Sequence, residues 1–516
     1  MKYKNIIIVF SFVFLISCNN FLEEEPFSFL SDANFPGTAE EGRIALNGAY
    51  SQFWKNRIIG YNNTLYQLSD SDLTSYGTNA YGSGFTTYQA FVRNTADSHP
   101  LWVWTDLYQG INSCNFVIDV VKNKNFEGSE GLVAEAKALR AWFYMELTNY
   151  FGDVPLRLSG TSSVSEVDAV RTDVLLIREQ ILKDLIESET IMKNDAETFA
   201  VQNRGGLLTL GAVKMMKIKL YTLMAGWRRT SAGETVPGDK SYWSNVVVTA
   251  KEIIDMGIYE LEPDFVKLWI DLYTDVYNKE TIWEIDFSMP ANGNYMSEAL
   301  TGPGRGPGRA GGYGGHRSTL AFYQSYDSQD VRRDWTVNWF YFNPDYETAI
   351  RGPRSDNRPY IQKFRKVDNA GVYDGRSPQN FAVYRYADLL LLYAEAINEV
   401  NNGPTIEAYN AINAVRYRAR PVDHKLDGTV LPDLTNLDYA SFKEAIIDER
   451  AWELAFEGQR RMDLIRWGLF MERIQALPDD SYGAPKAANV RPYHMLYPIP
   501  QQEMDLNSGW DQNDMW

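Results

Sequence analysis

Four stretches of the chain place apolar residues every three or four positions, a spacing that gives an α-helix one apolar face. They cover residues 132–150, 210–223, 386–397 and 406–415. Gly152 and Pro155 follow the first stretch and Gly226 follows the second, and both residue types end helices. Gly403 and Pro404 separate the last two stretches. The pattern predicts a mostly helical fold in which residues 386–415 form a helical hairpin.

Helical periodicity fades between residues 280 and 380, where Gly, Pro, Asn and Tyr dominate. Residues 302–308 read Gly-Pro-Gly-Arg-Gly-Pro-Gly, which excludes regular structure there. A shorter irregular stretch is expected at residues 70–105. Long loops are usually functional or disordered, and twelve aromatic residues within 302–365 argue against disorder. The sequence therefore predicts a helical scaffold that carries large aromatic loops.

The N-terminus has the features of an export signal. Lys2 and Lys4 precede an apolar run over residues 6–16, which as a helix would rise only about 16 Å, against roughly 30 Å for a hydrocarbon core. The run ends in Leu-Ile-Ser-Cys18, which resembles a bacterial lipobox and implies a signal peptide at residues 1–17 and lipidation of Cys18. The alternative is an ordinary signal peptide that happens to contain a cysteine. No other apolar run approaches 18 residues, so we expect an exported protein that a lipid tethers to a membrane.

Composition narrows the function classes. The 516 residues are 45% hydrophobic and include 14 Trp, 32 Tyr and 25 Phe, which excludes a disordered chain. The net charge of −17 makes the chain a poor candidate for binding nucleic acid, because such binding depends on neutralising phosphates. With Cys18 lipidated, Cys114 has no partner for an intramolecular disulfide. Cys114 lies on a probable helix, where we expect a small buried apolar residue.

The sequence contains no convincing catalytic or metal-binding motif. Glu449, Glu453 and Glu457 share one helix face, so they cannot flank a glycosidic bond as the two carboxylates of a glycosidase do. We interpret them as a structural ion-pair network, compensated by the arginines that lie close in sequence: Arg450, Arg460, Arg461 and Arg466. The four histidines show no zinc-ligand spacing, and neither a Gly-x-Ser-x-Gly elbow nor a phosphate-binding loop is present. We expect neither an enzyme nor a cofactor.

Several segments together resemble the SusD/RagB family of outer-membrane nutrient-binding lipoproteins. They are AEAKALRAWFY at 134–144 with FGDVPL at 151–156, RYADLLLLYAEA at 385–396, DERAWELAFEGQR at 448–460 with DLIRWG at 463–468, and YPIP at 497–500. The resemblance implies a mostly α fold of tetratricopeptide-like helical hairpins, with an irregular insertion that carries the ligand site. It also implies glycan binding, or peptide binding in some members, and a role as a lid over a SusC-like TonB-dependent transporter.

The expected organisation follows from combining the resemblance with the pattern. A lipidated tether and irregular start should occupy residues 18–40, and a single domain residues 41–516. Within it the helical scaffold should cover about 41–270 and 381–475, and the loop-rich insertion about 280–380. The expected function is capture of oligosaccharides or polysaccharide at the outer-membrane surface and delivery to the transporter. Oligopeptide capture by the same architecture is the alternative, and a surface glycoside hydrolase is a third.

Aromatic rings suit sugar binding because the C–H faces of a pyranose pack flat on a ring, while amides, carboxylates and guanidinium groups bond the hydroxyls. Both irregular stretches offer such groups. The candidate glycan-binding residues are Asp70, Asp72, Tyr76, Tyr81, Phe85, Tyr295, Tyr313, Arg332, Trp335, Asn338 and Trp339. The competing interpretation is that these rings pack beneath the loops as small local cores.

The insertion differs in charge from the rest of the chain. Residues 302–365 hold 9 Arg and 1 Lys against 5 Asp and 1 Glu, a balance of +4, so the remainder of the chain carries −21. Arginine pairs bidentately with carboxylates and sulfates, so an anionic glycan is one hypothesis. The other is that the arginines brace the loops by bonding backbone carbonyls. Neutral and anionic glycans both remain open from the sequence.

Overall fold

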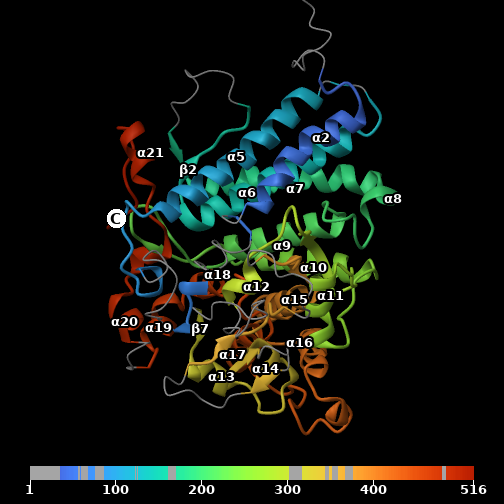
Figure 1. Ribbon diagram of the computed structural model, residues 1–516, viewed down its shortest axis with the longest axis vertical. Helices are drawn as coiled ribbons and strands as arrows, with labels where there is room; N and C mark the ends of the chain where they lie inside the picture. The colour runs from blue at the N-terminus through green and yellow to red at the C-terminus, as the bar shows by residue number, and fades with distance from the viewer. Residues whose placement is uncertain are drawn as a thin grey trace, which may run out of the picture.

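The computed structural model describes residues 35–55, 58–59, 68–75, 87–122, 124, 126–160, 170–300, 316–342, 348–350, 358–366, 376–478 and 484–516. Helices dominate the described parts of the chain (Figure 1). Cys18 and the segment 302–308 lie outside the described residues. In the helices that are described, none is long and apolar enough to cross a membrane.

The N-terminal half of the scaffold is a succession of packed helices. They are α2 (Ala39–Tyr50), α5 (Ser98–Val121), α6 (Ser129–Phe151), α7 (Val174–Asn194), α8 (Ala196–Phe199), α9 (Leu210–Ala225), α10 (Tyr242–Asp255) and α11 (Phe265–Thr274). α5 packs on α6, α6 on α7, α7 on α9 and α9 on α10, so neighbours in sequence are neighbours in space. Gly152 and Gly226 cap α6 and α9, which confirms the helices predicted at 132–150 and 210–223.

The C-terminal half adds α15 (Tyr386–Asn401), α16 (Ile406–Arg418), α17 (Tyr439–Glu453), α18 (Arg460–Arg466), α19 (Phe470–Gln475), α20 (Ala484–Asn489) and α21 (Gln501–Leu506). α15 packs against α16 and α17, and also against α10 of the first half. The predicted hairpin at 386–415 is confirmed: α15 ends at Asn401 and is capped by Asn402, whose φ of 52° lets the chain reverse before Gly403. The fold is therefore mostly α and built of helical hairpins, as the resemblance implies.

Short elements fill the segment between the two scaffold halves. They are β6 (Thr281–Ile285), α12 (Met296–Leu300), β7 (Arg317–Ser318), α13 (Leu320–Ser325), α14 (Val331–Thr336), β8 (Val337–Asn338), β9 (Phe340–Phe342), β10 (Thr348–Ile350), β11 (Tyr360–Ile361) and β12 (Phe381–Arg385). β6 and β12 are buried along their whole length and pair antiparallel, with Phe381 opposite Ile285. This ladder closes the base of the insertion. Both strands are rich in β-branched and aromatic residues, a signal that helical periodicity does not detect.

The described chain also contains three further two-stranded ladders and one four-stranded sheet. β2 (Val154–Pro155) pairs with β3 (Arg171–Thr172), β4 (Arg228–Arg229) with β5 (Thr235–Val236), and β9 with β10. The first lies just beyond the C-terminal end of α6, where Gly152 reverses the chain with a φ of 70°.

The expectation of irregular structure over residues 70–105 is wrong from Ser98 onward. α5 begins there, with Pro100 in its first turn, where proline is tolerated. Trp104 therefore belongs to a helix face and is 3% exposed in the core. Cys114 lies on the same helix with a fully buried, free thiol whose pKa burial raises, so the prediction of a small buried residue is confirmed.

Aromatic packing joins the scaffold to the base of the insertion. The Phe53 ring stacks on Phe143 of α6 at 5.3 Å between centroids and meets the edge of Trp283 of β6 at 5.4 Å. Trp142 completes the group, 4.9 Å from Phe53 and 6.1 Å from Trp283. β6 is therefore fixed to α6 through rings, which gives the insertion a rigid base.

The contact between α5 and α6 depends on Gly110. A Cβ atom there would lie 2.6 Å from the Phe143 ring, so we expect Gly110→Ala to lower the free energy of unfolding by about 1–3 kcal/mol through overpacking. Gly48 of α2 is the matched control, because a Cβ there meets no atom within 4 Å. Gly48→Ala should instead stabilise the protein by about 0.5–1 kcal/mol. Urea unfolding followed by circular dichroism measures both, and equal stabilities of the two variants would contradict this packing argument.

Candidate functional site

A four-stranded sheet brings the two predicted loop regions together. Its strand order is β1 (Thr74–Ser75), β7, β11 and β8. Thr74 pairs with Ser318 and Ser75 with Arg317, so the first loop region forms the edge of a sheet whose other strands come from the insertion. The Ser318 hydroxyl and the Thr319 backbone both donate to the Leu73 carbonyl, at 2.9 and 3.1 Å. Residues about 240 positions apart thus share one surface.

Several rings of the insertion lie around this sheet. Tyr323 of α13 is partly exposed, and its ring meets the edge of Trp339 at 4.8 Å. The Arg333 guanidinium lies 5.0 Å from the centroid of the Tyr323 ring. Trp335 of α14 is also partly exposed, and its Nε1 donates to the Lys363 carbonyl at 3.2 Å. These contacts fix the rings of Tyr323 and Trp335 while leaving part of each open to solvent.

Two of the described arginines of the insertion, Arg317 and Arg365, donate hydrogen bonds to backbone carbonyls. This is the bracing role that one of the two hypotheses from the sequence predicted. The Arg365 guanidinium lies 4.0 Å from the Trp335 centroid and donates to the carbonyls of Asp334 and Trp335 at 3.0 and 2.6 Å. Burial lowers the pKa of Arg365 to about 9, against the opposing effect of Asp334. Arg317 covers the Tyr360 ring at 3.5 Å and donates to the Arg358 carbonyl. We therefore favour the bracing role over anion binding for Arg317 and Arg365.

Asp70 and Asp72 are both held in ion pairs, which favours an anchoring role over their predicted role as contact residues. The fully buried Asp70 carboxylate accepts from Arg93 at 2.6 and 2.7 Å and from Arg461 at 3.3 Å. Asp72 accepts two hydrogen bonds from Arg460, at 2.9 and 2.7 Å. Burial would raise the pKa of Asp72, but Arg460 outweighs it and the pKa is lowered. Both carboxylates serve to anchor the first loop region.

The C-terminal segment reinforces this anchor. Lys486 of α20 is fully buried and donates to the carbonyls of Ser71 and Thr74, at 2.7 and 2.8 Å. Burial lowers its pKa to about 8 although Asp70 and Asp72 oppose the shift. Together with Arg460 and Arg461, this lysine ties residues 70–75 to segments almost 400 positions later. Strand β1, at the edge of the sheet, is therefore anchored to the C-terminal segment by buried charged side chains.

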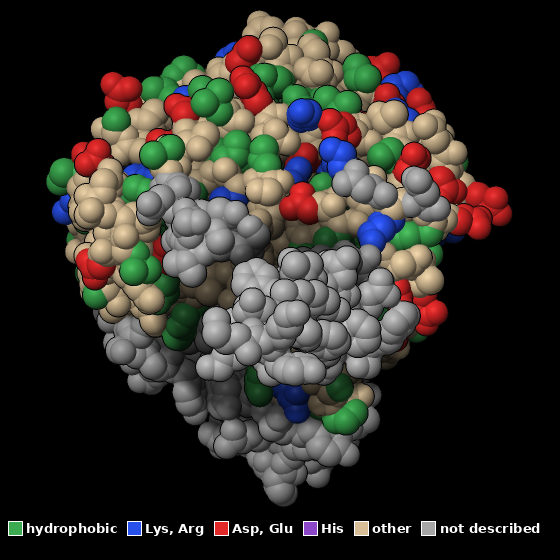
Figure 2. Space-filling model, turned by 90° about the horizontal axis from the view of Figure 1, so that it is seen from above, with side chains coloured by type: hydrophobic (Ala, Val, Ile, Leu, Met, Phe, Trp, Pro, Cys, Tyr) green, Lys and Arg blue, Asp and Glu red, His purple; other side chains and the backbone are tan. Residues whose placement is uncertain are grey.

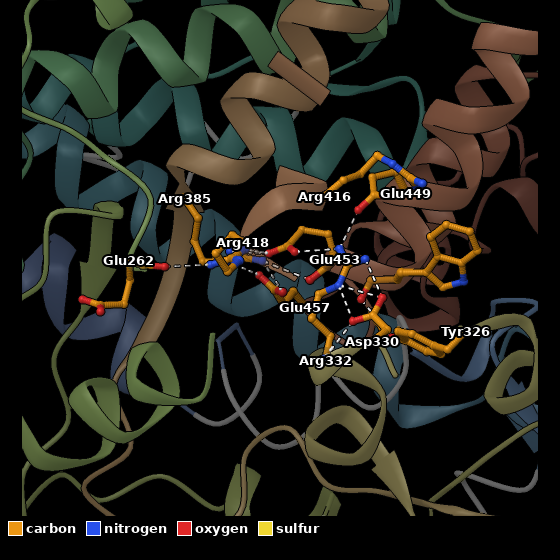
Figure 3. A network of polar contacts seen from close by, with 12 residues as sticks. Glu262, Tyr326, Asp330, Arg332, Arg385, Arg416, Arg418, Glu449, Glu453 and Glu457 are labelled. Atoms are coloured by element: carbon orange, nitrogen blue, oxygen red, sulfur yellow. Dashed lines mark hydrogen bonds and ion pairs between the residues drawn. The ribbon is translucent and has the colours of Figure 1, made fainter. Parts of the chain in front are cut away.

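Arg332 is likewise unavailable to a ligand, because its side chain is completely buried in an ion-pair network (Figure 3). Its guanidinium donates to Asp330 at 2.7 Å, to Glu449 at 2.6 Å and to Glu453 at 3.0 Å. These carboxylates raise the pKa of Arg332 well above its usual value, against the effect of burial. The assignment of Arg332 as a glycan contact is corrected to a structural one.

The remaining candidates divide into three groups. Asn338 and Trp339 are each 5% exposed, and the Asn338 side chain accepts from the Trp339 backbone at 2.7 Å, so both belong to the packing of the sheet. Tyr295, just before α12, and Trp335 are partly exposed and remain candidates. Tyr76, Tyr81, Phe85 and Tyr313 lie outside the described residues. Tyr323 was not among the predicted residues. Its place beside Arg333 and Trp339 nevertheless makes it a better-supported candidate for ligand contact than Tyr295.

Glu449 and Glu453 of α17 and Glu457, which lies four residues beyond the end of that helix, form an ion-pair network, as predicted, but with other partners. Arg385 donates to Glu453 at 3.0 Å and to Glu457 at 2.8 Å. The network also includes Arg332, Arg416, Arg418, Lys363, Asp330, Glu280 and Glu449. The arginines expected to compensate pair elsewhere: Arg450 with Asp388 and Asp463, Arg460 with Asp72, Arg461 with Asp70, and Arg466 with Glu395 and Asp463. Their expected pairing with the α17 glutamates is therefore wrong.

The charged groups of the described surface form no metal site. Across the described ranges, no three His, Cys, Asp or Glu side chains are grouped so as to hold an ion. The face shown in Figure 2 carries more acidic than basic side chains, and its hydrophobic side chains are scattered. The sheet region therefore presents partly exposed aromatic rings on a rigid support, and these rings can bind a ligand.

The described architecture is a helical scaffold with a ring-bearing insertion, and comparisons with known proteins show which proteins it is similar to. Residues 329–516 match the SusD family, and residues 20–205 match the family described as starch-binding and associating with the outer membrane. SusD-like protein P25 of Formosa agariphila is 28% identical, over 98% of this chain and 97% of its own. These matches show that the chain is similar to SusD-family proteins over most of its length.

Solved structures agree with this similarity. A SusD homolog from Bacteroides thetaiotaomicron superposes with a TM-score of 0.82 at 26% identity, covering 94% of this chain and 98% of its own. Surface glycan-binding protein A from the same species, solved in complex with laminarihexaose, has a TM-score of 0.72 at 20% identity, covering 92% of this chain and 99% of its own. The similarity to surface glycan-binding protein A is a similarity of fold.

Proposed function

We propose that this protein captures oligosaccharides or polysaccharide at the outer-membrane surface and delivers them to a SusC-like TonB-dependent transporter. The observation that carries the proposal is the β1–β7–β11–β8 sheet, which joins both aromatic loop regions in a chain similar to SusD-like proteins along nearly its whole length. A lipid on Cys18 would hold the protein at the membrane. The tether at residues 18–40 and the single domain at 41–516 are part of the same proposal.

Binding, without covalent chemistry, is the action that the site supports. Tyr323 and Trp335 expose part of their rings, which can pack against the apolar face of a sugar. Each ring is fixed by a neighbouring cation, Arg333 and Arg365 respectively, so little side-chain entropy is lost on binding. The buried carboxylates of Asp330 and Glu449 are both paired with Arg332 of α14. A pre-organised surface for sugar stacking follows from these contacts.

The test is an affinity panel that includes laminarihexaose, other neutral hexasaccharides and acidic hexasaccharides. We expect Tyr323→Ala and Trp335→Ala each to weaken binding of the preferred glycan about tenfold, because a stacked ring contributes roughly 1–1.5 kcal/mol. Isothermal titration calorimetry measures the loss. Trp227→Ala is the matched control, since Trp227 is 42% exposed but lies outside the insertion.

Three results would contradict the proposal. New reducing ends released from a polysaccharide by the purified protein would show an enzyme. Tight binding of oligopeptides with no binding of any glycan would show the alternative ligand class. Unchanged glycan affinity in both ring variants would show that the glycan-binding site does not include Tyr323 and Trp335.

A further inference from the structure

An open groove runs between α5 and the C-terminal segment that contains α21. Its volume is about 610 Å³, within the range of roughly 300–1,000 Å³ that ligand pockets occupy. Figure 1 places α5, β2 and α21 at the upper left of the molecule, and α13 and α14 of the insertion at the bottom. In the described chain, the groove shares no lining residue with the predicted glycan site.

Two faces of the chain oppose each other across the groove. α5 contributes Trp104 and Tyr108, one turn apart, and the C-terminal segment contributes Glu503 and Trp510. The Trp104 ring is buried and lies 5.0 Å from Tyr108 and 6.2 Å from Trp510 between centroids. The buried tryptophan therefore supports two partly exposed rings, one on each side.

Two side-chain acceptors at the groove receive no hydrogen bond from the described residues. The Gln52 side chain is 9% exposed; its amide nitrogen donates to the Gly48 carbonyl, while its Oε1 accepts no hydrogen bond. The Glu503 carboxylate is half-buried, and no side chain or backbone group of the described residues donates to it. A buried acceptor left unbonded is unfavourable, so a ligand that donates to Gln52 would recover free energy. Glu503, which is already partly exposed, offers a second acceptor.

We propose that this groove is a second carbohydrate-binding site, specific for neutral sugars. Two partly exposed rings offer stacking surfaces, and Gln52 and Glu503 offer acceptors for hydroxyl groups. The charges of Arg157 and Glu503 offset each other, so the lining does not favour an anion. An extended peptide is a poor fit, because the backbone groups of α5 are already bonded within the helix and cannot pair with another strand.

The experiment is native mass spectrometry of the full chain with laminarihexaose and with neutral hexasaccharides of mannose, xylose and α-linked glucose. We expect two bound ligands per chain for at least one of these probes. Glu503→Gln and Trp510→Ala should each reduce this to one ligand. The near-isosteric Glu503→Gln preserves packing even if Trp510→Ala disturbs the fold. Asp505→Asn, an exposed change in the same helix, is the control and should retain two ligands.

The outcomes distinguish the second site from the proposed function, on which this proposal rests only for the class of ligand, a carbohydrate. A single ligand that Tyr323→Ala removes and Glu503→Gln retains would overturn the second site and leave the proposed function intact. A single ligand that Glu503→Gln removes and Tyr323→Ala retains would support the groove and relocate the principal site. No binding of any probe to the wild-type chain would overturn both.

Discussion

Replacing Glu453 with glutamine is expected to lower the free energy of unfolding by about 3–5 kcal/mol, the usual cost of breaking a buried ion pair by removing one partner. Glu453 is fully buried and accepts from Arg385 and Arg332, each at 3.0 Å, and from Arg418 at 2.5 Å. An amide at this position supplies no charge and turns donor hydrogens toward guanidinium groups that have only donors to offer. Urea unfolding at neutral pH measures the loss.

The size of this effect follows from the charge balance of the network. Five cations, Arg332, Arg385, Arg416, Arg418 and Lys363, face five carboxylates, Asp330, Glu280, Glu449, Glu453 and Glu457. Removing one carboxylate leaves an uncompensated positive charge away from water. The network joins the insertion, through Arg332, to helices of the C-terminal half. We therefore expect the variant to loosen the support of the candidate site as well as the scaffold.

The matched control is Glu444 on the same helix, α17. Its carboxylate pairs with Arg473 at 2.7 Å, but its side chain is 58% exposed. Glu444→Gln should change the free energy of unfolding by less than about 1 kcal/mol, because solvent screens an exposed pair. Equal losses in Glu453→Gln and Glu444→Gln would contradict the assignment of a buried network.

The pH dependence of this network has a definite sign. Burial would raise the pKa of Glu453, but Arg418, Arg385 and Arg332 outweigh it and hold the pKa well below its ordinary value. A carboxyl group with a lowered folded pKa stabilises the protein above its unfolded pKa, and that stability is lost as the pH falls. The contribution is therefore fully present at neutral pH and absent in strong acid.

The helices were predictable from the sequence because their signal is local. Leu132, Leu139 and Phe143 lie at helical spacing, and Gly152 ends the helix they form. The spacing of Glu449, Glu453 and Glu457 predicted a common helix face, which is confirmed for Glu449 and Glu453 but wrong for Glu457, because α17 ends at Glu453. Their partners were not predictable: Arg332 lies 117 positions from Glu449. No local rule pairs residues so far apart, so the arginines nearest in sequence were the wrong choice.

The candidate site was harder to predict for a related reason. Residue types show that a loop can bind a ligand, but they do not show which side chains point outward. Asp70 and Arg332 have the right chemistry for sugar hydroxyls, yet both are buried in ion pairs that only the folded chain brings together. Tyr323 and Trp335 have the same chemistry as Trp339, and burial alone distinguishes them. The β1–β7 pairing is equally non-local, so the sequence could indicate two loop regions without joining them.

Glu146 of α6 should make the protein less stable as the pH rises through the range 4.5 to 7. Its carboxyl group lines a partly open cavity of about 100 Å³ together with Tyr384 and Asn149. Burial raises the pKa of Glu146 to about 7, although Lys219 and Arg461 oppose the shift. Lys219 is already paired with Asp388, so it compensates Glu146 only in part.

The sign follows from proton linkage. Below about pH 4.5 the carboxyl group is protonated in both the folded and the unfolded chain, so it costs nothing. Between about pH 4.5 and 7 the unfolded chain releases this proton while the folded chain retains it, so the free energy of unfolding falls with rising pH. A difference of about 2.5 pKa units corresponds to about 3 kcal/mol, and the loss is complete above pH 7.

Glu146→Gln removes the titrating group and keeps the shape of the side chain. Its free energy of unfolding, measured relative to wild type by urea denaturation, should therefore improve by about 3 kcal/mol between pH 4.5 and pH 8. Glu179→Gln on the exposed face of α7 is the control and should follow the wild-type profile. If the difference between Glu146→Gln and wild type were the same at both pH values, Glu146 would have to be ionised in the folded protein throughout, with Lys219 and Arg461 compensating the cost of its burial.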